Sequence, residues 1–109
     1  MAALVGQPEG NNAAQVPVSF TRRALRDLTA IRSYIADDNP LAASRLAVEI
    51  VAACDKLEQF PERGRPGLRR GTRELTVVWP YVIVYRIVES NVEILTIWHG
   101  ARDRSGQRK

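Results

Sequence analysis

Hydrophobic residues recur at helical spacing early in the chain. Between positions 22 and 38 they form one stripe, while arginine and aspartate residues occupy the other positions around the helical wheel. This period predicts an amphipathic helix whose stripe packs on a core. Thr21 precedes the stretch and is a residue type that caps helix N-termini. The residues of the stripe are Leu25, Leu28, Ile31 and Ile35.

A second helical pattern follows after a very short connection. Asn39 and Pro40 suit the N-cap and the first position of a helix, because asparagine accepts an amide hydrogen bond and proline needs no donor there. The pattern runs from Leu41 to about Phe60, so we expect two antiparallel helices joined as a hairpin. Its hydrophobic face consists of Ala43, Leu46, Ala47, Ile50, Cys54 and Leu57.

The second half of the chain changes to the period of strands. The segment 72–78, "TRELTVV", alternates, which places Leu75 and Val77 on one predicted face and Glu74 and Thr76 on the other. A short alternating segment near the N-terminus, "VPVSF", predicts one further strand.

Two more strands complete the pattern. The segment 81–88, "YVIVYRIV", is hydrophobic on both faces, which is typical of a central strand covered on both sides. After the turn "ESN", the segment 92–99, "VEILTIWH", is the last strand. The order β-α-α-β-β-β predicts an α+β domain, in which the helical hairpin covers one face of a small, mostly antiparallel sheet.

The length of 109 residues allows one domain, which we place at 16–104 between a flexible leader (1–15) and a basic tail (105–109). No hydrophobic run is as long as a membrane span, and the start lacks the pattern of a secretory signal. The single cysteine, Cys54, cannot form an internal disulfide. We therefore expect a cytoplasmic protein with no membrane association.

Positive charge is concentrated in the loop before the second strand. The segment 62–73 holds five arginines against one glutamate, a net charge of +4 that equals the net charge of the whole chain. These arginines either form a solvated surface or bind an acidic protein or a nucleic acid. The second interpretation is possible because a guanidinium group can form two hydrogen bonds to a carboxylate or a phosphate. The five arginines are Arg63, Arg65, Arg69, Arg70 and Arg73.

Few other residues suggest chemistry. The glycines of "GRPGLRRG" are better read as turn residues than as a phosphate loop, because a strand and not a helix follows. One histidine, one cysteine and no clustered carboxylates predict no metal and no cofactor. Cys54 falls on a hydrophobic face, so we expect an inert thiol. His99 is either a general acid or base, or a strand-end residue bonded to backbone, and the second interpretation is favoured.

Four aromatic residues near the arginines also have two interpretations. They stack on nucleic-acid bases, or they pack in the core and across strands, and core packing is the commoner role. They are Trp79, Tyr81, Tyr85 and Trp98.

Several segments, in order, resemble the ParE branch of the RelE/ParE toxin superfamily: "IRSYIADDNPLAASRLAVEI", "LEQFPERGRPG", "GTREL", "PYVIVYRI" and "VEILTIWHGARD". The resemblance covers about Val16 to Arg104 and implies the same β-α-α-β-β-β fold. It implies the toxin of a type II toxin–antitoxin module of the kind linked to plasmid stabilisation. It also implies a ParD-like antitoxin partner, whose often acidic C-terminal segment folds over the toxin in a hetero-oligomer.

The resemblance leaves two activities open, because the ParE branch is associated with poisoning DNA gyrase and the RelE branch cleaves mRNA on the ribosome. RelE-like enzymes carry an arginine shortly before the "Y-x-x-V-Y" strand, where this chain has "VVWP". A nuclease would have to use Arg73, Arg86, His99 and Arg102, with no convincing base beyond His99.

We therefore favour a non-enzymatic toxin that inhibits gyrase. The alternatives are a ribosome-dependent mRNA endonuclease and a degenerate, non-toxic binding module of the same fold. The residues expected to contact the antitoxin or the target are Arg63, Arg65, Arg69, Arg70, Arg73, Trp98, His99 and Arg102.

Overall fold

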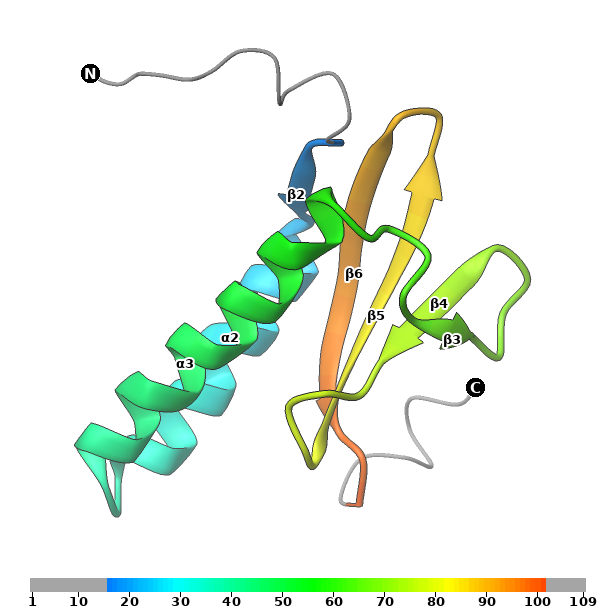
Figure 1. Ribbon diagram of the computed structural model, residues 1–109. Coiled ribbons are helices and arrows are strands. Elements are labelled where there is room, and N and C mark those ends of the chain that lie inside the picture. Colours follow the sequence, from blue (N-terminus) through cyan, green and yellow to red (C-terminus); the bar gives the residue numbers. More distant parts are fainter. Residues whose placement is uncertain (1–15, 102–109) are drawn as a thin grey trace, which may run out of the picture.

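The computed structural model describes residues 16–101, which fold as two layers (Figure 1). Helices α2 (Arg22–Ala36) and α3 (Pro40–Asp55) form one layer, side by side as a hairpin, and a sheet forms the other. No helix within this part of the chain is long and hydrophobic enough to cross a membrane. The predicted leader (1–15) and basic tail (105–109) lie outside the described residues.

The sheet has five strands in the order β2-β6-β5-β4-β3. β2 pairs parallel with β6 and the other neighbours are antiparallel, so the sheet is mixed. The predicted α+β fold and element order are confirmed, with one addition: the short strand β3 lies inside the arginine-rich loop. The strands are β2 (Val18–Phe20), β3 (Arg65–Pro66), β4 (Thr72–Leu75), β5 (Tyr81–Val88) and β6 (Asn91–His99).

Both helices begin at the positions that the capping residues Thr21 and Asn39 predicted. The side-chain oxygen of Thr21 accepts a hydrogen bond from the Ala24 amide at 3.1 Å, and Asn39 Oδ1 accepts one from the Ala42 amide at 3.0 Å. Pro40 is the first residue of α3. These bonds satisfy amides that have no partner within the helix, which fixes the two starting points.

The core lies between the helical hairpin and one face of the sheet. Its largest fully buried side chains include Tyr85, Ile50 and Leu57, and the predicted hydrophobic face of α3 is confirmed. Cys54 is completely buried, in agreement with its predicted role as a packing residue. The sheet contributes Leu75, Ile83, Val92, Ile94 and Ile97 to this core.

Two predictions about side-chain faces are wrong. Leu25 is 51% exposed whereas Ala24 is fully buried, so the buried stripe of α2 is turned toward Ala24. In the segment 72–78, Leu75 is buried and Thr76 is exposed, but Val77 is 51% exposed and Glu74 only 6% exposed, so the predicted alternation fails at these two residues. The reason is that β4 ends at Leu75, so the strand period does not continue to Val77.

Helix α3 is shorter than predicted, and strand β5 is less covered than predicted. α3 ends at Asp55, and a single 3₁₀ turn, η1 (Lys56–Glu58), replaces the expected continuation to Phe60. β5 is the central strand, as predicted, but Arg86 and Val88 are exposed. Its second face is therefore covered only over the first half of the strand.

The buried hydroxyl of Tyr85 ties the loop after η1 to the sheet. This hydroxyl donates a hydrogen bond to the Pro61 carbonyl at 2.7 Å and accepts one from the Gly64 amide at 2.8 Å. A Cβ atom at Gly64 would lie only 2.8 Å from the same hydroxyl, so the loop can approach only with glycine there. Burial raises the pKa of Tyr85, which keeps the hydroxyl protonated and able to donate.

Asp27 joins α2 to the outer edge of β6. Strand β2 pairs with β6 only as far as Ile94. Beyond that point, Asp27 Oδ2 accepts hydrogen bonds from the Ile97 amide at 3.0 Å and from Thr96 Oγ1 at 2.5 Å. The helix side chain thus takes the place of the missing strand and fixes α2 along the sheet edge.

We expect Tyr85→Phe to lower the free energy of unfolding by about 1–3 kcal/mol, because two buried backbone groups lose their partner. Urea denaturation measures this loss. The matched control is Tyr34→Phe on the surface of α2, where Tyr34 is 63% exposed and the change should be small. Equal stability of Tyr85→Phe and the wild-type protein would contradict the tie between loop and sheet.

The buried thiol of Cys54 leads us to expect that the free energy of unfolding falls at alkaline pH. Burial raises the pKa of its thiol from 9.0 to about 12. The folded chain therefore holds this proton more tightly than the unfolded chain, and stability should fall as pH rises from about 9 toward 12. Tyr85 acts in the same direction. Unfolding curves across this range should be less steeply pH-dependent for Cys54→Ala, and an unchanged slope would refute the assignment.

Candidate functional site

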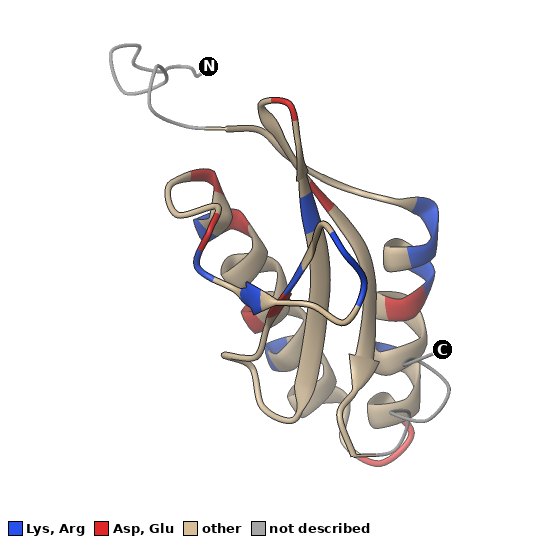
Figure 2. Ribbon diagram, turned by 90° about the vertical axis from the view of Figure 1, so that its right-hand side faces the viewer, with Lys and Arg blue, Asp and Glu red and all other residues tan. Residues whose placement is uncertain are grey.

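The arginine-rich loop is a small β-hairpin rather than an unstructured turn. Strands β3 and β4 pair antiparallel, and the Gly67 amide donates a hydrogen bond to the Thr72 carbonyl at 2.8 Å. Gly71 has a φ of 84°, a conformation that glycine adopts without strain. The tip of this hairpin carries Arg69 and Arg70, and Figure 2 shows its basic segments in front of the sheet.

Two of the loop arginines stabilise the base of the hairpin. Arg65 donates from Nε and Nη2 to Glu74 Oε1 at 3.1 and 2.9 Å. A buried carboxylate is costly without such a partner, and Glu74 is 6% exposed. Arg73 Nη1 donates to the carbonyls of Gly64 at 2.6 Å and Glu62 at 3.2 Å. Arg65 therefore joins the two strands of the hairpin, and Arg73 binds the hairpin to the preceding loop.

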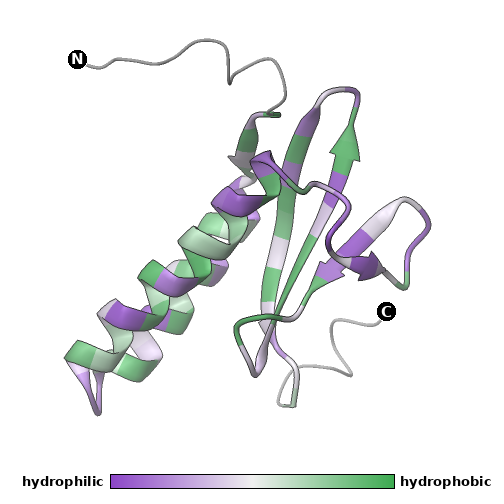
Figure 3. Cartoon of the chain, in the orientation of Figure 1, coloured by the Kyte–Doolittle hydropathy of each residue, from purple (hydrophilic) through white to green (hydrophobic). Residues whose placement is uncertain are grey.

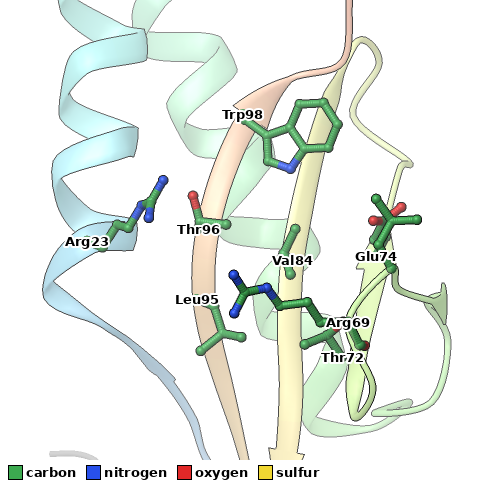
Figure 4. Close-up of a pocket in the computed structure, with 9 residues that line it drawn as sticks. Arg23, Arg69, Thr72, Glu74, Val84, Leu95, Thr96 and Trp98 are labelled. Carbon is green, nitrogen blue, oxygen red and sulfur yellow. The ribbon is translucent and has the colours of Figure 1, made fainter. Parts of the chain in front are cut away.

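A cavity of about 310 Å³ opens on the face of the sheet that points away from α3 (Figure 4). Arg23 reaches it from α2, and Arg69 reaches it from the hairpin. The two guanidinium groups point toward each other across β6. The floor between them is formed by Val84, Leu95 and Thr96.

The cavity suits an anionic group beside an aliphatic one. Its two arginines can bind carboxylate or phosphate, and its floor is largely aliphatic. Trp98 lines the cavity too, but it is 4% exposed and so offers little ring surface for stacking a base. Glu74 also lines the cavity, while its Oε1 is held by Arg65.

A second hollow of about 560 Å³ continues along the same face. It shares Arg69 and Leu95 with the first cavity and extends to Arg70 and Arg86. Together the two hollows form one groove, which we call the arginine groove. It runs between the hairpin tip and the start of α2, so its walls come from segments far apart in the sequence.

The residues predicted for a nuclease are engaged in separate contacts. Arg86 Nε donates to Glu93 Oε1 at 2.7 Å on the exposed part of β5. The ring of His99 lies edge-on to Tyr81, with centroids 5.2 Å apart. His99 Nδ1 also accepts a hydrogen bond from the Ala101 amide at 3.2 Å. This is the kind of backbone contact that the strand-end interpretation of His99 expects.

Strand register shows that these residues do not converge. Arg73 is paired with Tyr85 and His99 with Tyr81, which places them four positions apart along β5, roughly 13 Å. Arg86 follows Tyr85 directly, so its side chain points to the opposite face of the sheet.

The residues predicted to contact a partner divide into groups. Arg65 and Arg73 stabilise the hairpin, Trp98 is buried, and His99 contacts Tyr81. Arg102 lies outside the described residues. The remaining members in the loop, Arg63, Arg69 and Arg70, are exposed, and Arg65 is exposed as well.

The expectations for the aromatic residues can be compared with the structure as well. Tyr81, Tyr85 and Trp98 are buried, as core packing requires, while Trp79 is 81% exposed.

Within residues 16–101, no group of three or more His, Cys, Asp or Glu side chains could hold a metal ion.

Arg23 and Glu74 are among the groove residues that sequence patterns missed. One signal for Arg23 was available: the first turn of α2 carries Arg22 and Arg23 and no acidic residue. Positive charge at a helix N-terminus opposes the helix dipole, so it commonly serves something other than helix stability. For Glu74, local alternation gave no indication of a buried ion pair.

Comparison with known proteins agrees with this fold. Residues 18–104 match the family described as the ParE toxin of type II toxin–antitoxin system, parDE. The chain is 52% identical over 86 residues to "Toxin RelE2" of Caulobacter vibrioides, covering 78% of this chain and 96% of that protein. It is 47% identical over 83 residues to "Putative toxin Y4kP" of Sinorhizobium fredii, covering 75% and 85%.

Solved structures give the same result. The chromosomal ParDE toxin–antitoxin system from P. aeruginosa is similar with a TM-score of 0.73 and 29% identity, over 79% of this chain and 97% of that one. The toxin–antitoxin complex RelBE2 from Mycobacterium tuberculosis is similar with a TM-score of 0.61 and 28% identity, over 79% and 92%. The family match, the identity to curated toxins and the shared fold together show that this chain belongs to the ParE toxin family of type II toxin–antitoxin systems, within the RelE/ParE superfamily.

Proposed function

We propose that this toxin acts in the bacterial cytoplasm by inhibiting DNA gyrase, without cleaving RNA. The observation that favours this activity over RNA cleavage is the separation of Arg73, Arg86 and His99. Metal-free RNA cleavage needs a base, an acid and cations around one phosphate. Here Arg73 is bonded to backbone carbonyls, Arg86 is paired with Glu93, and His99 lies near the far end of β5.

We further propose that a ParD-like antitoxin neutralises the toxin in a hetero-oligomeric complex. The similar structures are titled as toxin–antitoxin systems or complexes. The arginine groove suits an acidic segment, because its lining carries four arginines against two glutamates and its floor accepts aliphatic side chains. In such a complex the apolar contacts would supply most of the affinity, and exposed arginines would mainly accelerate association.

The alternative is a ribosome-dependent mRNA endonuclease. Two observations favour it: similar curated proteins carry the name RelE, and the groove combines Arg23 and Arg69 with the buried carboxylate of Glu74. Cations near a carboxylate can serve acid–base chemistry on a phosphate. For Glu74 to act as a base, however, it would have to give up its contact with Arg65. A non-toxic binding module remains the third interpretation.

We expect the purified toxin to trap linear DNA when it is incubated with supercoiled plasmid, gyrase and ATP, followed by detergent and protease. A parallel assay with translating ribosomes should leave the mRNA intact. Cleaved mRNA with unaffected gyrase would instead establish the nuclease. Glu74→Gln and His99→Ala would then distinguish the carboxylate from the histidine as base, since loss of the true base costs about 10²-fold or more in rate.

The hairpin tip yields a prediction about antitoxin binding. Replacing both Arg69 and Arg70 with alanine should slow association with an acidic antitoxin by about tenfold at low ionic strength, because long-range attraction is weakened. Stopped-flow measurements should show that this difference shrinks as salt is added. The control is Arg32→Ala, an exposed arginine of α2 outside the groove. Because Arg32→Ala removes one charge and the tip variant removes two, equal slowing per charge removed would mean that net charge, rather than the hairpin tip, governs association.

A further inference from the structure

Helix α3 carries hydrophobic residues on two opposite faces. One face enters the core through residues such as Ile50 and Cys54, both fully buried. On the other side, Leu41 is 61% exposed and Val48 is 68% exposed. A surface helix normally carries charged and polar residues opposite its core face, and a helix that is hydrophobic all round is normally buried. The outer side of α3 therefore resembles a face that another element covers.

The exposed outer side of α3 has a line of hydrophobic and small residues, which we call the outer strip: Leu41, Ser44, Val48 and Ala52. Their spacing of three, four and four residues keeps them on one face, over about 16 Å of helix. All four are exposed, and the strip ends where Asp55 closes the helix. Figure 1 shows α3 in front of α2, with no other described strand or helix over this side, and Figure 3 shows hydrophobic segments recurring along it.

The two small residues of the outer strip, Ser44 and Ala52, allow another helix to come close. Small side chains at a helix contact bring the axes toward the short end of the usual 8–10 Å range. A serine inside a helix can donate its hydroxyl to the carbonyl four residues before it, so Ser44 can be covered without losing its hydrogen bond. The larger side chains, Leu41 and Val48, then fill the space beside the small ones. The strip is thus shaped for a second helix rather than for an extended segment or a small molecule.

Charges beside the outer strip are balanced, unlike those of the arginine groove. Arg45 and Glu49 lie one turn apart on the same flank of α3, and both are exposed. An acidic partner segment would gain from Arg45 and lose to Glu49. A partner that presents both charges in the reverse order would satisfy both, and an antiparallel copy of α3 does so.

We propose that the outer strip of α3 binds the outer strip of a second copy of this chain, antiparallel, with Val48 at the two-fold axis. In that arrangement Val48 meets Val48 of the partner subunit, and Ser44 lies opposite Ala52 of the partner subunit. Because the two-fold keeps the same flank together, Arg45 lies beside Glu49 of the partner subunit, displaced by only about 3 Å along the helix axis. The pair forms twice, so the surface is self-complementary.

The size of this contact indicates a weak dimer. α3 has 16 residues. A helix of that length spans about 24 Å, and a single helix pair buries less than the roughly 800 Å² per partner of a standard interface. We therefore expect a dissociation constant on the order of tens of micromolar, with monomer dominant at nanomolar concentration.

Sedimentation equilibrium of the full-length toxin, made by cell-free synthesis, tests this inference over roughly 1–200 µM, a range that brackets the expected constant. The wild-type chain should shift from monomer toward dimer, and Val48→Asp should remain monomeric. Val77→Asp is the matched control, since Val77 is also exposed but lies outside α3, and it should dimerise normally. Association is measured without gyrase, ribosomes or antitoxin, so its failure is separate from any failure of the proposed toxic activity.

A cysteine placed at the two-fold axis gives a sharper test. Val48→Cys should form a disulfide-linked dimer under mild oxidation, while Val77→Cys should not. Arg45→Glu and Glu49→Arg should each weaken dimerisation about tenfold, and the two changes combined should restore it.

A wild-type chain that stays monomeric throughout the concentration range would overturn the inference. So would a Val48→Asp variant that dimerises like wild type, because the contact would then use another surface. If Val48→Asp lowers antitoxin affinity while the free toxin is always monomeric, the outer strip belongs to the antitoxin interface and self-association is refuted.

Discussion

The two hydrogen bonds of the Tyr85 hydroxyl determine where the arginine-rich hairpin lies. Tyr85 is on the central strand and fully buried, so its hydroxyl is a fixed point of the core. By binding the Pro61 carbonyl and the Gly64 amide, it brings the loop after η1 onto the sheet. With the loop in this position, Arg73 can reach the Gly64 carbonyl. Strand β3 can then pair in register with β4. The position of Arg69 above β5 follows from these contacts.

The five arginines of the loop therefore have different roles. Arg65 pairs with the carboxylate of Glu74, and Arg73 donates to the Gly64 carbonyl. Both side chains therefore stabilise the base of the hairpin. Arg69 and Arg70 are carried outward on the hairpin tip. A flexible loop of the same composition would lose more conformational entropy when it bound an acidic partner. Ordering the hairpin in advance reduces that cost and concentrates positive potential at one rim of the sheet.

Local periodicity predicted what depends on neighbours in sequence. Both helix starts, the core face of α3 and the central position of β5 all follow from spacing and capping. Glu74 could not be placed in this way, because its burial depends on Arg65, which pairs with it from another strand. Nor could the spacing on α2 distinguish Ala24 from Leu25, since that choice depends on how the helix lies against the sheet.

The candidate site was less predictable than the fold for the same reason. The arginines of the loop were identified from composition, but the groove also needs Arg23, which joins it only through the packing of α2 beside β6. Conversely, Arg73, Arg86 and His99 were grouped by residue type, whereas strand pairing separates them. Pairing partners and sheet faces are set by long-range contacts, which no local pattern encodes.

The bond between Asp27 and β6 has a consequence for what the groove can select. Arg23 is one helical turn before Asp27, so the backbone that carries it is attached to the sheet edge. The opposite wall is attached through Tyr85. With both walls anchored, the width of the groove is a constant of the fold, and only the arginine side chains can adapt. In the proposed binding role, such a site would favour ligands whose anionic groups are spaced to suit two fixed walls. It would exclude ligands that require the walls to move.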